Sequence, residues 1–138
     1  MHAILKNSLV ALALLSSAST APRAIAGGQP IGIWLDHTGR GAVQITDCAG
    51  NLCGRIVWTK DSSNGSVCGK QVIGNAKPIA GGKWDGGWIL DVDDDRKYQV
   101  EITPLSNGNL QVTGYLGSKL LSETMIWTRA PADTKTCA

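Results

Sequence analysis

A period of two in the apolar residues, broken by turn residues, limits the folds open to this chain. Tyr98, Val100 and Ile102 alternate with polar residues. This spacing places the apolar side chains of a strand against a core and the polar ones in water. An Asn-Gly turn at residues 107–108 follows, and the alternation returns over residues 110–113. The pattern predicts a β-hairpin.

Glycine and other turn residues recur about every eight to twelve positions, and helical periodicity is nearly absent after the first 26 residues. The fold class is therefore all-β. We expect eight strands with short links, which favours an up-and-down antiparallel barrel without exposed sheet edges. The predicted strands lie near residues 32–35, 42–48, 53–59, 71–75, 84–91, 97–105, 110–116 and 122–129.

The amino-terminal segment has the pattern of a secretory signal. An apolar run at residues 9–15 follows a basic residue, and a small-residue end closes at Ala26. The run is too short for a membrane span, which needs about twenty residues. We predict a signal peptide over residues 1–26, with cleavage after Ala18 as the alternative, and one domain over residues 27–138. The protein would then be periplasmic or secreted.

The charge of the expected mature domain is balanced. Removal of the signal takes away Lys6 and Arg23 and leaves eleven basic and eleven acidic residues. No basic stripe of the kind that binds DNA or RNA is evident, so we expect no nucleic-acid partner.

The four cysteines all lie in the predicted exported part, where an even number indicates disulfide bonds. Cys48 and Cys53 flank a predicted four-residue turn, and we expect them to sit directly opposite each other and to bond. A bridge between Cys68 and Cys137 would close a much larger loop, and buried free thiols are the alternative. The mature part has one histidine, His37, and no C-x-x-C pair, which argues against zinc and redox sites.

Several short motifs in order resemble the bacterial family called domain of unknown function 2147. The resemblance implies a lipocalin-like barrel, in an exported protein without an established activity. It also implies that Arg129 lies across Trp34 and helps to close one end of the barrel, a structural role. The motifs are Gly32-x-Trp34, Cys53-Gly54-Arg55-Ile56-Val57-Trp58, Trp84-Asp85-Gly86-Gly87, Lys97-Tyr98, Gly114-Tyr115-Leu116-Gly117 and Trp127-Thr128-Arg129.

Aromatic residues are the candidate ligand-binding side chains. In a barrel they could line a cavity at its mouth, or they could simply fill the core. We also expect a β-bulge at residues 86–87 to turn Trp84 and Trp88 toward the same face. The candidates are Trp58, Trp84, Trp88, Tyr98 and Tyr115.

Polar candidates for catalysis or metal binding are few. The run at residues 91–95 resembles the start of a calcium-binding loop but lacks the glycine and glutamate that such a loop needs, so we predict a turn and no metal. His37 lies in a predicted exposed turn without a catalytic motif. Asp85 and Glu123 could act as a carboxylate pair only if the fold brings them together. We therefore expect neither a cofactor nor enzymatic activity.

Two functions fit these features best. The first is an exported barrel that binds a small apolar or aromatic ligand, which requires an internal cavity of a few hundred cubic ångströms. The alternative is a periplasmic interaction or inhibitor module with a closed core, which would show an exposed apolar patch instead.

Overall fold

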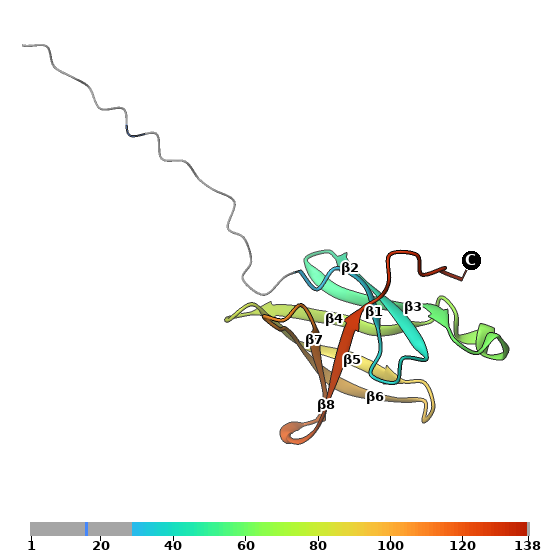
Figure 1. Ribbon diagram of the computed structural model, residues 1–138. Helices are drawn as coiled ribbons and strands as arrows, with labels where there is room; N and C mark the ends of the chain where they lie inside the picture. The colour runs from blue at the N-terminus through green and yellow to red at the C-terminus, as the bar shows by residue number, and fades with distance from the viewer. Residues whose placement is uncertain (1–15, 17–28, 138) are drawn as a thin grey trace, which may run out of the picture.

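Eight antiparallel strands in sequence order close into a barrel in the computed structural model, which describes residues 16 and 29–137 (Figure 1). Each strand pairs with the next along the chain, and β8 returns to β1. The expected signal peptide lies outside the described residues. The strands are β1 (Gly32–Leu35), β2 (Gly41–Cys48), β3 (Asn51–Thr59), β4 (Gln71–Ile79), β5 (Lys83–Asp91), β6 (Arg96–Pro104), β7 (Leu110–Leu116) and β8 (Ser118–Arg129).

The predicted all-β, eight-stranded up-and-down barrel is confirmed. All eight strands lie where the alternation placed them, although β4 and β8 extend four residues further than expected, at the C-terminal end of β4 and the N-terminal end of β8. One short 3-10 helix, η1 (Ser62–Val67), occupies the polar loop between β3 and β4. The described part of the chain contains no helix with the length and apolar character needed to cross a membrane.

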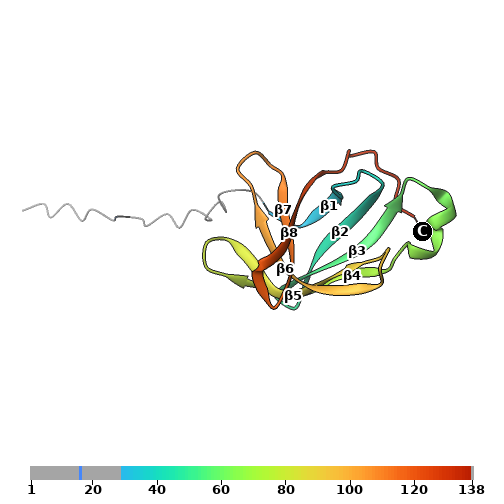
Figure 2. The same cartoon turned by 90° about the horizontal axis from the view of Figure 1, so that it is seen from below.

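The barrel closes through a short seam between its first and last strands. Only Trp34 and Leu35 of β1 pair with β8, opposite Arg129 and Thr128. β8 has twelve residues and β1 has four, so the N-terminal part of β8 extends beyond this seam and does not pair with β1. Figure 2 shows the resulting shape, in which the strands cross in a strongly twisted sheet.

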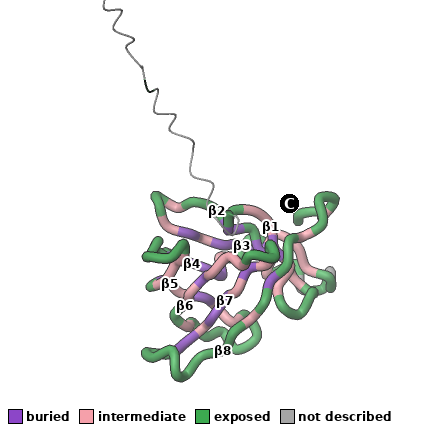
Figure 3. Tube along the Cα trace, turned by 60° about the vertical axis from the view of Figure 1, so that its left-hand side comes forward, coloured by how far each residue is buried: buried purple, intermediate pink, exposed green. Residues whose placement is uncertain are grey.

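Buried positions occur along most strands of the barrel (Figure 3). We call the end at which β1 begins and β8 ends the closed end. Trp34, Leu110 and Trp127 are each at most 3% exposed there. Leu110 and Trp127 are direct cross-strand partners. The opposite end, which we call the open end, carries the β1–β2 and β5–β6 loops and η1.

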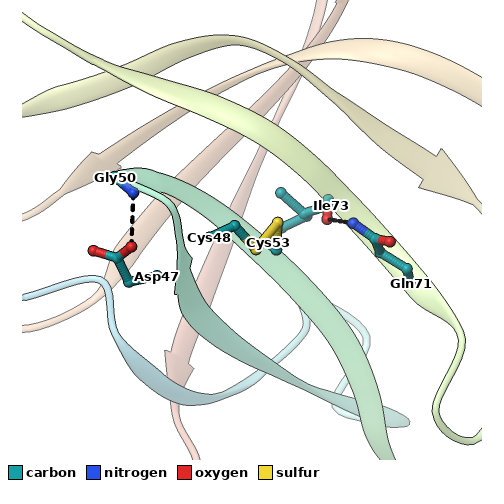
Figure 4. The surroundings of a disulfide bond; sticks show 6 residues. All are labelled: Asp47, Cys48, Gly50, Cys53, Gln71 and Ile73. Carbon is teal, nitrogen blue, oxygen red and sulfur yellow. Dashed lines mark hydrogen bonds between the residues drawn. A yellow bond between two sulfur atoms is a disulfide. The ribbon is translucent and has the colours of Figure 1, made fainter.

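The Cys48–Cys53 disulfide staples the β2–β3 hairpin, but its register differs from the prediction (Figure 4). The turn has two residues, Ala49 and Gly50, both with positive φ, and the Asp47 carboxylate accepts a hydrogen bond from the Gly50 amide. Cys48 therefore pairs with Asn51. The two cysteines are diagonal neighbours with Cα atoms 5.8 Å apart, not direct partners. The expectation of a four-residue turn was wrong.

The second disulfide joins Cys68, after η1, to Cys137 at the end of the chain. After β8 the chain turns back along the outside of the barrel, and the disulfide bond holds Cys137 beside the end of η1 (Figures 1 and 2). The amide of Ala130 donates to the Ile33 carbonyl, and that of Cys137 donates to the Val57 carbonyl. This bridge fixes the last segment across the outer surface of β1 and β3.

Candidate functional site

A cavity of ≈1280 Å³ occupies the open end of the barrel. Its wall is apolar because the inward positions of most strands carry aliphatic side chains. Tyr98 and Met125 complete this wall from β6 and β8. A barrel of this size can be filled by its own side chains, and this one is filled only at its closed end. The buried wall residues are Val43, Ile56, Val72, Ile89 and Trp127.

A glycine makes room for part of this cavity. Gly114 lies on β7 at a position that follows the inward-facing Val112 by two residues, and it lines the cavity. A Cβ atom at Gly114 would lie 3.7 Å from both Ile89 and Tyr98, which is ordinary contact. A Cβ atom therefore fits at this position, and we expect a longer side chain to extend from it into the cavity.

The rim of the cavity is charged, and most of its charged side chains are acidic. Six carboxylates line it, against the basic side chains Arg40 and Lys60. Three of the acids serve local structure by accepting hydrogen bonds from nearby amides. The six are Asp36, Asp61, Asp91, Asp93, Asp94 and Glu123.

An apolar lip borders the same opening. Leu116, Leu120 and Leu121 line the cavity and are 45%, 94% and 71% exposed. The register between β7 and β8 jumps here, because Leu116 pairs with Ser118 while Tyr115 pairs with Ser122. Residues 119–121 therefore bulge from the ladder and carry the two most exposed leucines into solvent.

Lys119 anchors this bulge to the outer face of the barrel. Its ammonium lies 2.7 Å from the Asp85 carboxylate on β5 and 2.5 Å from the Glu101 carboxylate on β6. The Tyr115 hydroxyl donates to the other oxygen of Asp85 at 2.5 Å. The lip is thus held by an ion-pair network that lies outside the cavity.

The network changes the acidity of its members. Burial favours the neutral acid, but hydrogen bonds from Lys119, Tyr115 and the Gly86 amide outweigh it and hold the pKa of Asp85 below its ordinary value. Hydrogen bonds to Asp85 and Glu101 raise the pKa of Lys119. Burial and the bond to Asp85 raise the pKa of the Tyr115 phenol.

Replacement of Asp85 by asparagine is expected to destabilise the fold by about 1 kcal/mol near pH 7, which corresponds to about 4 to 8 °C in melting temperature. A depressed folded pKa gives stability that is present above the unfolded pKa of about 3.9 and is lost as pH falls through the folded pKa. The difference between wild type and Asp85→Asn should therefore shrink below about pH 4. Thermal unfolding followed by circular dichroism at several pH values measures it.

Asp133→Asn is the matched control, because Asp133 is exposed and has no ion-pair partner among the described residues. It should leave the melting temperature within about 1 °C of wild type. A deficit in Asp85→Asn that stays the same from pH 7 to pH 3 would show that the network does not act through the charge of Asp85.

Of the five aromatic candidates, the structure brings only Tyr98 to the cavity. Trp58 lies in a smaller groove of ≈220 Å³ on the outer surface, beside Leu35 and the C-terminal residues Pro131 and Thr134. Tyr115 is buried on the outer side of β7, where it bonds to Asp85.

Trp84 and Trp88 face opposite sides of the sheet, which corrects the expectation that a bulge turns both the same way. Trp84 pairs with Ile102, and Gly87 pairs with Val100, so two residues of β5 lie between these pairs opposite one residue of β6. The extra residue reverses the alternation beyond the bulge. Trp84 consequently packs against the core, whereas Trp88 lies on the outer face under the ammonium of Lys97, which is 4.2 Å from the ring centroid.

The closed end carries the Trp34 and Arg129 pair. The guanidinium lies 4.0 Å from the centre of the Trp34 ring, and Arg129 also donates to the carbonyls of Gln29 and Ile31. The indole N–H of Trp34 donates to Pro30 at 2.8 Å. Gly32 has a φ of 135°, and a side chain at this position would overlap Arg129. The pair therefore ties the segment before β1 to the end of β8.

The polar candidates are dispersed. His37 is exposed in the β1–β2 turn and lines the mouth of the cavity. Asp85 belongs to the outer network and Glu123 lines the cavity, so the two do not form a carboxylate pair. Asp91 accepts hydrogen bonds from the amides of Asp93 and Asp94, as a turn requires. Within residues 29–137, no cluster of three or more potential metal ligands is present.

Two features of the site were not predicted from the sequence, namely the place of Glu123 on the inner face and the exposed leucines at the opening. Glu123 alternates with Met125 on β8, and this period of two could have placed its carboxylate on the inner face. The lip of Leu116, Leu120 and Leu121 had a weaker signal, a pair of adjacent leucines next to a Gly-Ser turn. Its exposure depends on the register jump between β7 and β8, which the local sequence does not specify.

Comparison with known proteins agrees with the fold. The profile of a family described as "Uncharacterized protein conserved in bacteria (DUF2147)" matches residues 32–129. A solved structure, described as "Protein HP1028 from the human pathogen Helicobacter pylori belongs to the lipocalin family", superposes with a TM-score of 0.62 at 17% identity. The match covers 76% of this chain and 85% of that one. Comparison with curated protein sequences gives no match.

Proposed function

The chain belongs to the DUF2147 family, and we propose that it binds a small, largely apolar molecule in the open end of its barrel without catalysing a reaction. The cavity of ≈1280 Å³ carries this proposal. Small-molecule sites in proteins usually measure about 300 to 1,000 Å³ and have apolar walls with a few polar groups. This cavity is somewhat larger than that range, and its apolar wall opens to solvent through a rim of charged residues.

The leucine lip supports the same function. Exposed apolar side chains at an opening give an apolar ligand a surface to contact before it enters, and Leu116, Leu120 and Leu121 lie at this opening. The lip also favours the second candidate function, an interaction or inhibitor module, since exposed apolar patches mark protein contacts. An open cavity is not needed for that role, so we place it second.

Location outside the cytoplasm is part of the proposal. Both disulfides join residues of the barrel domain, and disulfides persist in oxidising compartments such as the periplasm. The expected signal peptide over residues 1–26 agrees with this.

A substitution that fills the cavity tests the function. Gly114→Leu should weaken binding of the neutral fluorescent probe N-phenyl-1-naphthylamine by at least about tenfold, because the new side chain occupies the space. Gly114→Ala should have a smaller effect. Gln44→Leu adds the same side chain on the exposed face of β2 and should leave binding unchanged. Fluorescence titration measures all four proteins.

Native mass spectrometry of protein purified from its own compartment gives an independent readout. A retained small apolar adduct, lost in Gly114→Leu, supports the binder. Probe binding that is absent in the wild type, or equal in wild type and a folded Gly114→Leu, overturns the proposal. A co-purifying protein with a ligand-free cavity favours the interaction module instead.

A further inference from the structure

The distribution of charge over the molecule is uneven. Six of the eleven acidic residues in residues 27–138 line the cavity, but only two of the eleven basic residues in the same range do so. The mouth therefore has a formal charge of −4 in a domain whose basic and acidic residues are equal in number. Clefts lined by one sign of charge concentrate ligands of the opposite sign.

The nearby cations do not cancel this excess. The guanidinium of Arg96 lies 5.8 Å from the centroid of the Tyr98 ring and adds one positive charge beside the mouth. Lys119 is committed to Asp85 and Glu101 on the outer face. Among the described residues, the carboxylates around the opening still outnumber the cations by two to one.

Glu123 is the acid best placed to meet a ligand. It lies opposite Gly114 in the β7–β8 ladder and two residues before Met125, and all three line the cavity. No hydrogen bond or ion pair joins the Glu123 side chain to another described residue. Glu123 is exposed at the mouth, so its charge faces the solvent through which a cationic group would enter the cavity.

We infer that the cavity selects positively charged amphiphiles, with an apolar body against Ile56, Ile89 and Met125 and an ammonium-type group beside Glu123 and the acidic rim. This inference rests on the proposed function and names its ligand class. The Tyr98 ring lies on the same wall and offers a face to which cations are attracted. Anionic amphiphiles of the same length would meet repulsion at the mouth.

Displacement of N-phenyl-1-naphthylamine by three probes with the same chain tests the inference. At low salt and below their micelle concentrations, decyltrimethylammonium should bind about tenfold more tightly than decyl sulfate, with 1-decanol between them. Added salt should reduce the difference. Glu123→Gln should weaken decyltrimethylammonium binding about threefold and leave 1-decanol unchanged.

Lys135→Gln is a control that changes one charge outside the cavity and should alter none of the three affinities. Equal affinities for the two charged probes, or tighter binding of decyl sulfate, would overturn the inference while the proposed function stands. Failure of every probe, including the neutral dye, would instead reject the proposed function.

Discussion

Trp34→Ala is expected to lower the free energy of unfolding by about 3 to 5 kcal/mol, among the largest effects of any single substitution in this chain. Trp34 is 2% exposed, donates to Pro30 and lies beneath Arg129. Its removal leaves a cavity at the closed end and frees the guanidinium that ties Gln29 and Ile31 to β8. Urea unfolding measures the loss.

A second tryptophan provides the matched control. Trp88 lies on the outer face and is partly exposed, so Trp88→Ala should cost only about 1 kcal/mol. Trp34→Phe keeps most of the ring and loses the hydrogen bond to Pro30, with an expected cost of about 1 to 2 kcal/mol, and it gives a measurable protein if the alanine variant does not fold. Similar losses for Trp34→Ala and Trp88→Ala would contradict a closing role for Trp34.

Arg129 contributes separately to this closure. Arg129→Met keeps the apolar stem of the side chain but removes the cation over the ring and the two hydrogen bonds to backbone carbonyls. The loss of stability in Arg129→Met should lie between those of Trp88→Ala and Trp34→Ala, because the contacts that it removes are partly exposed.

The strand positions could be predicted because alternation and turn residues are local properties of the sequence. Tyr98, Val100 and Ile102 face inward as their spacing indicates. The Arg129 contact with Trp34 was implied by family resemblance, and no local pattern would have revealed it.

The side of the sheet that a side chain faces could not be predicted in the same way where a turn or a β-bulge interrupts the alternation. A two-residue turn at Ala49 requires a positive φ that alanine seldom adopts, so a longer turn was expected and the cysteine register was wrong. The bulge at Gly86 reverses the facing of Trp88 relative to Trp84. The extra residue of the bulge determines which side of the sheet each tryptophan faces, and the position of that extra residue depends on how β5 pairs with β6.

The cavity is harder still to predict, because it reflects the absence of side chains. Tryptophan, the most conspicuous candidate in the sequence, mostly packs at the closed end or outside the barrel. The space at the open end arises where Gly114 and aliphatic residues face inward. Composition alone does not show where such residues meet.

Loss of the Cys68–Cys137 disulfide is expected to have the other large effect. The cysteines are separated by 69 residues, and closing such a loop in the unfolded chain corresponds to about 4 kcal/mol in the chain-entropy model. The five-residue separation of Cys48 and Cys53 gives about 2 kcal/mol at most. The double variants Cys68→Ser/Cys137→Ser and Cys48→Ser/Cys53→Ser should therefore differ by about twofold in the stability they lose.

Urea unfolding of the two double variants, each against wild type, measures this difference, and each variant is the other's control because both remove one disulfide. The larger loss has a structural counterpart. Without the bridge, the last segment keeps its backbone bonds at Ala130 and Cys137 but nothing covalent holds it over the outer groove at Trp58. Cleavage after Lys135 by trypsin should then become faster only in the Cys68→Ser/Cys137→Ser variant. Equal stability losses in the two variants would show that the large loop is already restricted in the unfolded chain, since the entropic difference between the loops would then be absent.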